Sequence, residues 1–410
     1  MSEEKAVGRS SRRGFLTASG SVGLGATIAL TGAGSAQTGS GQDVAAGGLQ
    51  QEKDGLVTLG DRPTNAETPP HLLDDRVTPA DRIFVRNNGL PPAIESINPV
   101  TWELNVAGLV NTPLKLSIAD LKRDFDVVTL QLQMECAGNG RRYFTPGASG
   151  NQWTFGAIAC PQWTGVRLAD VLRAAGVKES AIYTAHYGAD THLSGDPAKE
   201  PISRGIPIEK AMDPHNLIAW AINDEEMPLV NGHPLRLVVP GWPGSCSQKW
   251  LTRIELIDRE HDGAKMTGKS YRVPAYPVAP GTDVPDEDMQ IIGSHPVKSL
   301  ITSPRTGSQI PPRQKTQITG HAWAGDREVS AVDVSIDFGR TWIAAELEAP
   351  ANRYAWQHWS AAIVPPQAGY FEVWARATDS EGEMQPATTP GWNPKGYLNN
   401  MQHRIAVYAV

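Results

Sequence analysis

The chain has 410 residues, which is long enough for two domains with substantial hydrophobic cores. It is 40% hydrophobic and 20% charged, as globular proteins usually are, and its 40 Gly and 32 Pro favour turns and short strands over long helices. The formal net charge is −7, and the body of the chain contains no Lys/Arg-rich run, which argues against nucleic acid as the main partner.

Residues 1–36 have the order of an export signal. Basic residues come first, a short and weakly apolar stretch follows, and small residues up to Ala36 offer a cleavage site. The sequence "SSRRGFL" resembles a twin-arginine signal, with Arg12 and Arg13 as the pair. A basic disordered tail is the alternative. The apolar stretch is too short to span a bilayer, so we expect a periplasmic protein, exported folded, without a membrane span after signal removal.

The next segments predict an arm followed by a mixed domain. Residues 37–79 are rich in Gly, Gln, Asp and Pro, which is typical of an irregular N-terminal arm. Residues 80–272 contain both strand and helix patterns. The stretches 101–110 and 235–242 predict strands, whereas apolar residues at i, i+3 and i+4 predict short helices over 116–125 and 166–177.

The C-terminal part predicts an all-β domain. Residues 273–295 are rich in Pro and Asp and indicate a linker. Residues 296–410 then carry strand patterns separated by turn signals, as in a β-sandwich; the clearest patterns lie at 317–325, 329–342, 370–382 and 403–410. We find no internal repeat.

Three cysteines, at positions 136, 160 and 246, are an odd number for an exported protein. No C-x-x-C or C-x-x-C-H motif occurs, which excludes a zinc ribbon and covalent c-type haem at the level of motifs. We predict that Cys160 and Cys246 are small buried hydrophobic residues, with a disulfide between them as the alternative.

Cys136 lies in a different context, the stretch "LQMECAGNGRRYF" at 132–144. Gly138 and Gly140 are expected to let the backbone approach a bulky ligand. The adjacent Arg141 and Arg142 favour a thiolate and bind anions. A thiolate in such surroundings is either a nucleophile or a soft metal ligand.

A nucleophilic cysteine needs a base. His186 and His192 are candidates, but the sequence does not place either beside Cys136. A zinc site from the two histidines would need a third ligand at a recognisable spacing, and none is present. The simpler interpretation places both histidines on loop surfaces.

The stretch "MECAGNGRR" resembles the molybdenum-binding loop of the sulfite oxidase family, and the resemblance covers nearly all of residues 80–410. The upstream segment "FVRNNGLPP" (84–92) resembles the family's anion-binding segment. After the cysteine loop, further motifs follow in family order: "GNQWTFGAI", "QWTGVRLADVL", "GIPIEKAMDP", "HPLRLVVPGWPGSCSQKWL", "SYRVPAYP", "DVSIDFGRTW" and "GWNPKGYLNNMQHRIAVYAV". The implied fold is α+β: a mixed α/β molybdopterin-binding domain followed by an Ig-like β-sandwich dimerisation domain.

The resemblance also implies roles for single residues. Cys136 corresponds to the protein ligand of molybdenum. Arg86 and Arg141 correspond to arginines that bind the substrate oxyanion, for which a guanidinium offers a rigid fork of donors. Lys395 stands where animal members have a third arginine, so it keeps the charge and loses the bidentate geometry.

Two aromatic residues and a set of polar ones complete the implied site. Trp153 corresponds to an aromatic wall of the pocket, and Tyr271, with a one-residue shift, to the active-site tyrosine. Asn88 and Asn231 replace histidines of some relatives, as in haem-free bacterial sulfite dehydrogenases. The residues implied to bind the pterin cofactor are Asn87, Asn88, Arg167, Asn231, Arg236, Ser247 and Lys249.

The implied activity is oxidation of sulfite to sulfate by oxygen-atom transfer at a molybdenum–molybdopterin cofactor. No haem domain is visible in this chain, so we expect a separate electron acceptor, such as a c-type cytochrome, and a homodimer. Four alternatives stay open: a methionine sulfoxide reductase with the same cofactor, a sulfane dehydrogenase subunit of a thiosulfate-oxidising complex, a non-catalytic exported Ig-like binding protein, and a thiol hydrolase that uses Cys136.

Overall fold

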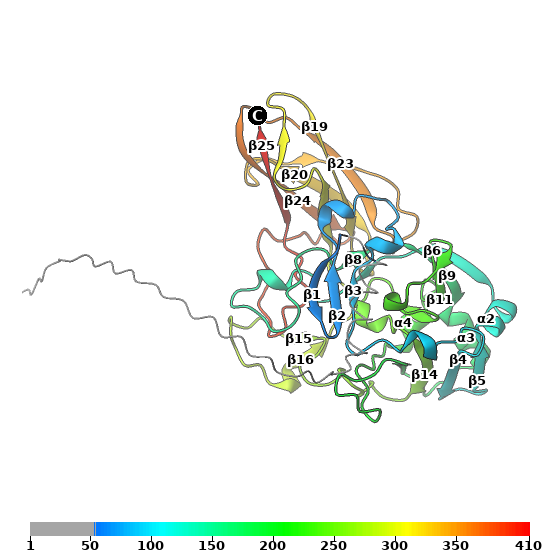
Figure 1. Cartoon of the computed structure of the whole chain (residues 1–410). Coiled ribbons are helices and arrows are strands. Elements are labelled where there is room, and N and C mark those ends of the chain that lie inside the picture. The colour runs from blue at the N-terminus through cyan, green and yellow to red at the C-terminus, as the bar shows by residue number, and fades with distance from the viewer. Residues whose placement is uncertain (1–52, 54) are drawn as a thin grey trace, which may run out of the picture. The chain divides into compact units, whose positions relative to one another are not determined.

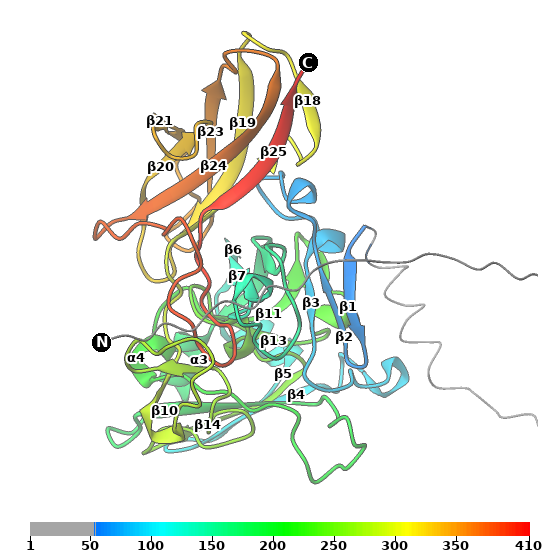
Figure 2. The same ribbon diagram turned by 90° about the vertical axis from the view of Figure 1, so that its left-hand side faces the viewer.

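The computed structural model describes residue 53 and residues 55–410, so the expected twin-arginine signal (1–36) and much of the expected arm lie outside the described residues. In Figures 1 and 2, a mixed part built from residues up to Ile291 lies below a β-sandwich built from Lys298 onward. None of the helices in the described part of the chain has the length and apolar character needed to cross a membrane.

A three-stranded antiparallel sheet begins the described chain. Its strands are β1 (Val57–Asp61), β2 (Thr64–Glu67) and β3 (Val85–Arg86). This differs from the expected irregular arm, because the polar composition of the segment does not reveal a short hairpin that pairs with a later strand. The register places Asn65 opposite Arg86 and packs buried Ala66 against buried Val85.

Two larger sheets form the body of the mixed part. The first has the order β10-β14-β4-β5 and includes a parallel β14–β4 pair; its strands are β4 (Glu103–Gly108), β5 (Leu114–Ser117), β10 (Tyr183–Gly188) and β14 (Leu251–Ile257). The second has the order β12-β11-β9-β6, with β13 also paired to β11; its strands are β6 (Val127–Gln131), β9 (Gln162–Arg167), β11 (Leu217–Ile222), β12 (Glu225–Glu226) and β13 (Arg236–Val238). The strands predicted over 101–110 and 235–242 are confirmed as β4 and β13.

Three short α-helices accompany these sheets: α2 (Ile118–Asp124), α3 (Leu168–Ala175) and α4 (Ile208–Ala211). Ser117 and Asp120 form a capping box that starts α2, because each side chain bonds the backbone N–H of the other. Helix α3 buries Leu168, Val171 and Leu172 in a core shared with β4 and β14. Both predicted helices are confirmed, with shorter bounds.

Short elements carry the connections. Two 2-stranded sheets pair β7 (Met134–Glu135) with β8 (Ile158–Ala159) and β15 (Arg272–Pro274) with β16 (Met289–Ile291). The 3-10 helices are η1 (Pro70–Leu72), η2 (Ala80–Arg82), η3 (Ile94–Ser96), η4 (Arg141–Tyr143), η5 (Leu229–Asn231), η6 (Gly244–Cys246) and η7 (Asp286–Asp288). The segment expected to be a linker therefore contains paired strands, and its apolar residues Val284, Met289 and Ile292 are buried.

The C-terminal part is a two-sheet sandwich. One sheet has the order β17-β19-β23-β22, with strands β17 (Lys298–Ser303), β19 (Thr316–Trp323), β22 (Glu346–Leu347) and β23 (Gln357–Ile363). The other has the order β18-β25-β24-β20-β21, with strands β18 (Ser308–Ile310), β20 (Val329–Ser335), β21 (Ile343–Ala344), β24 (Gly369–Asp379) and β25 (His403–Ala409). Alternate residues of β24, among them Val373, Ala375 and Ala377, face the core around Trp359. The expected Ig-like sandwich and the mixed α/β domain are both confirmed.

The chain between β24 and β25 returns to the mixed part, as the orange-red loops below the sandwich in Figure 2 show. Leu398 N donates to Ala137 O at 2.9 Å, and Asn399 Nδ2 donates to Gly140 O at 2.7 Å. These contacts lie on the turn that follows Cys136. The sandwich therefore takes part in shaping the predicted site.

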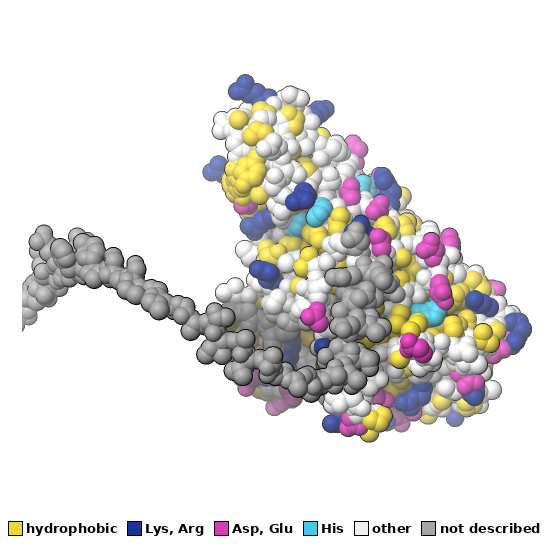
Figure 3. Space-filling view, viewed as in Figure 1, with side chains coloured by type: hydrophobic (Ala, Val, Ile, Leu, Met, Phe, Trp, Pro, Cys, Tyr) yellow, Lys and Arg dark blue, Asp and Glu magenta, His cyan; other side chains and the backbone are white. Residues whose placement is uncertain are grey.

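Figure 3 shows acidic and basic side chains interspersed on the face of the molecule that it draws. That face has no continuous basic stripe of the kind that tracks a nucleic-acid backbone.

Candidate active site

Cys136 follows strand β7 and starts a tight turn. Its N–H donates to Ala157 O at 3.0 Å, and its carbonyl accepts from Asn139 N at 2.8 Å. The Asn139 side chain closes the turn, because its Oδ1 accepts from Ala157 N at 3.1 Å. The Cys136 side chain, only 7% exposed, lies on the wall of an inner cavity. The turn thus fixes a thiol at the cavity wall, as a metal ligand requires.

The inner cavity brings together most of the residues that the resemblance assigned to the cofactor. It holds about 640 Å³ of space between its walls and its mouth. The predicted residues on its walls are Arg86, Asn87, Asn88, Cys136, Asn231, Arg236, Ser247, Lys249 and Tyr271. Convergence of several charged and polar side chains on one concave site is typical of a binding site for a small molecule or cofactor.

Basic side chains outnumber acidic ones in the inner cavity: Arg86, Arg236 and Lys249 line it with one carboxylate, Asp190. Arg236 donates to the carbonyls of Asn231 and Ser247, and burial lowers its pKa to about 9. Burial lowers the pKa of Lys249 well below its usual value, and the nearby Arg236 adds to this. Among the described residues, neither cation forms a salt bridge. An anionic ligand would supply the missing counter-charge.

Polar atoms without partners point to the same conclusion. Asn87 Nδ2, Asn231 Oδ1, Ser245 Oγ, Gln248 Oε1 and Asp190 Oδ1 are buried, make no hydrogen bond within the described protein, and belong to residues that line the inner cavity. Buried polar groups normally have partners. A heterocycle with several donors and acceptors and a phosphate group would satisfy them, so the residues present fit a molybdopterin.

An outer cavity of about 740 Å³ adjoins the inner one, since Arg86, Asn87, Asn88 and Tyr271 line both. Arg86 Nη2 donates to Asn88 Oδ1 at 2.8 Å, and Lys265 Nζ donates to the same oxygen at 2.9 Å. Burial, and then the charge of Arg86, lower the pKa of Lys265 to about 8. Asn88 therefore holds two cations side by side.

Arg141 reaches the outer cavity through a cage of glycines. A Cβ at Gly138 would lie 2.4 Å from its Nη2, one at Gly150 3.1 Å from its Nη1, and one at Gly396 2.8 Å from its Cγ. Its Nε donates to Lys395 O at 2.6 Å and its Nη1 to Asn151 O at 2.9 Å. In the described part of the chain, Nη2 has no protein acceptor, which leaves it available to a bound anion.

This geometry changes the predicted role of the glycines after Cys136. We expected Gly138 and Gly140 to let the backbone approach a bulky ligand. Instead, the missing side chain at 138 makes room for the Arg141 guanidinium, and Gly140 adopts a φ of 90° beneath the Asn399 side chain. The sequence could not show this, because Asn399 and Gly396 come from the far end of the chain.

Lys395 and Tyr271 complete the outer cavity. Lys395 Nζ donates to Ser149 Oγ at 3.3 Å, and Lys395 O accepts from Arg141 Nε, so the predicted residues Lys395 and Arg141 do meet. The ring of Tyr271 stacks on the ring of Tyr397, with centroids 5.5 Å apart. The Cζ atom of buried Arg204 lies 4.8 Å from the centroid of the Tyr271 ring. Tyr271 is thereby held between the two cavities.

Two predicted site residues, Trp153 and Arg167, line neither cavity. Trp153 is fully buried beside Phe84 in a core cluster and is on the wall of neither cavity. Arg167 ends β9, precedes α3, and likewise lines neither cavity. Alignment to a family motif placed both near the site, but tertiary packing decides which side of the strand or turn a side chain occupies.

The remaining cysteines and histidines do not form a second catalytic arrangement. Cys160 and Cys246 are both free and buried, so the alternative of a disulfide between them is wrong. Burial raises the pKa of Cys160 to about 12 and also raises that of Cys246. His192 lies on a loop and is partly exposed, in line with the expected loop position. The prediction of a loop-surface position for His186 is wrong, because His186 is buried on β10 and burial lowers its pKa to about 3. Neither histidine lines a cavity with Cys136.

Several site residues were missed at the level of sequence. Asp190 follows β10, and burial raises its pKa to about 6. Gln248 and Ser245 belong to a motif already noted, but only their place on the wall distinguishes them from its other residues. Lys265 has no signal in its sequence neighbourhood, since its partners Arg86 and Asn88 lie far away in the chain.

Comparisons with known proteins agree with this geometry. Residues 90–265 match the oxidoreductase molybdopterin binding domain, and residues 289–410 match the Mo-co oxidoreductase dimerisation domain. Sulfite oxidase of Gallus gallus is 35% identical over 362 residues, which cover 85% of this chain and 77% of that protein. Mitochondrial sulfite oxidase of Homo sapiens is 35% identical over 370 residues, which cover 86% of this chain and 66% of the human protein.

Among solved structures, the sulfane dehydrogenase SoxCD from Paracoccus pantotrophus superposes with a TM-score of 0.69 at 29% identity, covering 83% of each chain. The two family matches and the identities to sulfite oxidases extend over the mixed domain and the sandwich alike. The chain therefore belongs to the sulfite oxidase family of molybdopterin-dependent oxidoreductases.

Proposed function

We propose that this protein is a molybdenum-dependent sulfite dehydrogenase that oxidises sulfite to sulfate by oxygen-atom transfer and passes electrons to a separate acceptor, such as a c-type cytochrome. One observation carries the proposal: a cationic outer cavity, with Arg86, Arg141, Lys265 and Lys395 on its walls, adjoins the inner cavity that Cys136 lines and shares wall residues with it. A small dianion can thus be held beside the position of the metal.

In the inner cavity, the Cys136 thiolate would ligate molybdenum, which is chemically suitable because a soft sulfur donor stabilises a redox metal. Arg236 and Lys249 would bind the cofactor phosphate, and Asn87 and Asn231 would pair with its polar edge. The bound cofactor supplies the two-electron redox chemistry. The protein contributes the position, the charge and the exclusion of water.

In the outer cavity, the cations select and orient the substrate. The fixed position of Arg141 Nη2 and the Arg86–Lys265 pair offer donors from two sides, so an oxyanion loses little entropy on binding. Tyr271 lines both cavities, so its phenol is a further candidate donor to a bound oxyanion. Preorganised donors of this kind stabilise the charge that develops on sulfate.

A sulfane dehydrogenase is the second candidate, because the likeness to SoxCD extends over 83% of both chains. A sulfoxide reductase has less support, since a neutral sulfoxide does not need so many cations in the outer cavity. Sulfite, a sulfane-sulfur substrate and methionine sulfoxide should be compared as substrates of the same preparation. The proposal predicts the highest kcat/KM with sulfite.

The central test is a metal and activity measurement on the matured protein. We expect about one molybdenum per chain and sulfite-dependent reduction of ferricyanide and cytochrome c. Cys136→Ser should abolish turnover, whereas Cys160→Ala should retain it, because Cys160 lies in a separate core cluster. Absence of molybdenum from wild-type protein made in a cofactor-producing host would refute the proposal.

Location, assembly and cofactor content belong to the same proposal. The twin-arginine motif supports export to the periplasm, and the match of residues 289–410 to a dimerisation domain supports a homodimer. Replacement of Arg12 and Arg13 by lysine should keep the protein in the cytoplasm. Light scattering should give twice the chain mass of 44.2 kDa, less the removed signal, and the visible spectrum should show no haem.

A further inference from the structure

The residue before Cys136 is a carboxylate with an unusual set of partners. Glu135 is 1% exposed. Its Oε1 accepts from Asn139 Nδ2 at 2.9 Å and from Lys298 Nζ. Its Oε2 accepts from His295 Nδ1 and Trp323 Nε1, both at 2.8 Å. Lys298 and Trp323 belong to β17 and β19, so the sandwich supplies two of the four donors that surround this carboxylate.

The contacts indicate an ionised carboxylate. Two hydrogen bonds end on each oxygen, and Lys298, Trp323 and the Asn139 amide nitrogen act only as donors. Burial alone would raise the pKa of Glu135, but the charge of Lys298 and the contact with His295 outweigh it and lower the pKa. A buried ion pair therefore lies directly beside the predicted metal ligand in the chain.

A continuous set of contacts joins this carboxylate to the Cys136 turn. Glu135 fixes Asn139 Nδ2, and the same amide uses its Oδ1 to accept from Ala157 N at 3.1 Å. Ala157 O in turn accepts from Cys136 N at 3.0 Å. Movement of the Glu135 carboxylate would therefore change the support of the Cys136 backbone through Asn139 and Ala157.

We propose that Glu135 is a positioning residue through which the sandwich fixes the Cys136 turn, and that the Glu135–Lys298 pair sets the charge beside the metal ligand. The inference rests on the proposed function, because it assumes that molybdenum binds at Cys136. Glu135 need not touch substrate, and its contribution is exerted on the geometry and the redox potential of the metal.

The Glu135–Lys298 pair predicts the direction in which each substitution shifts the midpoint potential of the metal. Glu135→Gln removes the negative member and leaves Lys298 as an uncompensated buried cation, which favours the reduced metal and raises its midpoint potential. Lys298→Met leaves Glu135 uncompensated and lowers the potential. The double variant Glu135→Gln/Lys298→Met restores neutrality, so its potential should return toward that of the wild type.

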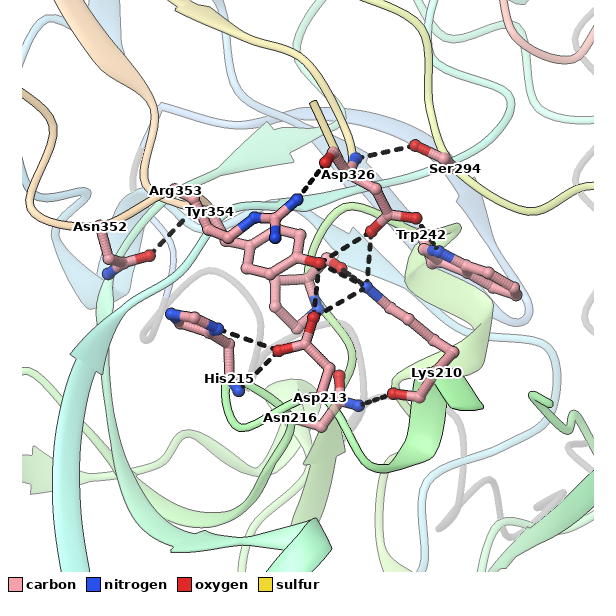
Figure 4. Close-up of polar contacts among 11 residues, drawn as sticks. Lys210, Asp213, His215, Asn216, Trp242, Ser294, Asp326, Asn352, Arg353 and Tyr354 are labelled. Atoms are coloured by element: carbon pink, nitrogen blue, oxygen red, sulfur yellow. Dashed lines mark hydrogen bonds and ion pairs between the residues drawn. The ribbon is translucent and has the colours of Figure 1, made fainter. Parts of the chain in front are cut away.

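A matched control exists at the same boundary between the two parts of the chain. Figure 4 shows Asp326 of the sandwich accepting from Lys210 Nζ and Trp242 Nε1 of the mixed part, at 2.7 and 2.6 Å. This carboxylate thus also has a lysine and a tryptophan as donors, but it does not contact the Cys136 turn. Asp326→Asn should lower the thermal transition and leave the metal potential unchanged.

The experiment uses the full-length, molybdenum-loaded protein. Redox titrations followed by Mo(V) electron paramagnetic resonance give the potentials and, from the shape of the signal, the geometry at sulfur. We expect Glu135→Gln and Lys298→Met to shift the potential in opposite directions, and Glu135→Gln also to change the signal and reduce molybdenum content. If Glu135→Gln does not fold, Lys298→Met and the double variant still test the predicted direction of the potential shifts.

Two outcomes overturn the inference separately from the proposed function. Potentials that move in the same direction in both single variants, or that match those of Asp326→Asn in fully loaded protein, would show that the pair supports folding alone. Wild-type protein without molybdenum would instead refute the proposed function, and the positioning role with it.

Discussion

The substitution Gly138→Ala tests whether the glycine after Cys136 serves Arg141. Its backbone has a φ that alanine can adopt, so the strain comes from contact alone. A Cβ would lie 2.4 Å from Arg141 Nη2 and 2.6 Å from Cζ. A free arginine would swing aside, but this one is held by Lys395 O and Asn151 O. We therefore expect the guanidinium to be pushed off its anion-binding position.

The magnitude follows from the bond that is lost. Hydrogen bonds to charged groups contribute about 1.5–3 kcal/mol, and each ~1.4 kcal/mol changes an equilibrium constant tenfold. Displacement of Nη2 should therefore lower kcat/KM for sulfite by about 10- to 100-fold, mostly through KM. The nearby Gly147→Ala is the control, because nothing lies within 4 Å of a Cβ at that position.

Steady-state kinetics with ferricyanide, together with molybdenum content and thermal unfolding, separate the possible causes. Gly138→Ala should keep the metal and lose sulfite affinity, while Gly147→Ala should behave as the wild type. A kcat/KM within twofold of wild type in loaded Gly138→Ala protein would refute the assigned role. Loss of molybdenum with unchanged sulfite affinity in the remaining active fraction would instead indicate that Gly138 is needed for cofactor binding.

Three further predictions concern the charges and the cysteines. Lys265 is protonated below its pKa of about 8 and neutral above it, so kcat/KM for sulfite should fall as pH rises through about 8. Lys265→Gln should lower kcat/KM at pH 7 and abolish this fall at alkaline pH. A pH profile of the variant that still falls near pH 8 would contradict the assignment. Arg236→Met should fold yet purify with less pterin, measured by fluorescence after oxidation, because the cavity loses a buried cation. Native protein should resist alkylation at Cys160 and Cys246, whose thiols are buried and whose pKa values are raised, and peptide mass spectrometry should find both modified only after unfolding.

The sequence alone determined the local elements and singled out Cys136 as the expected metal ligand. The Ser117 cap, the apolar spacing of α3 and the alternation along β24 are properties of neighbouring residues, so they could be predicted without tertiary structure. Cys136 could also be recognised from neighbouring residues, since the glycines and arginines of its motif lie within six positions of it. Composition was less informative over 57–67 and 272–291, where short strands pair with partners that the local pattern does not specify.

Only the tertiary structure decided which charges meet. Arg141 is held by Lys395 O, Lys265 by Asn88, and Glu135 by Lys298, in each case across more than a hundred residues of chain. For Trp153, the motif resembled the family's but did not determine the position of the side chain. Its ring packs beside Phe84 in a core cluster. Such contacts depend on how separate segments are brought together by burial of apolar surface, and that burial is a property of the whole fold.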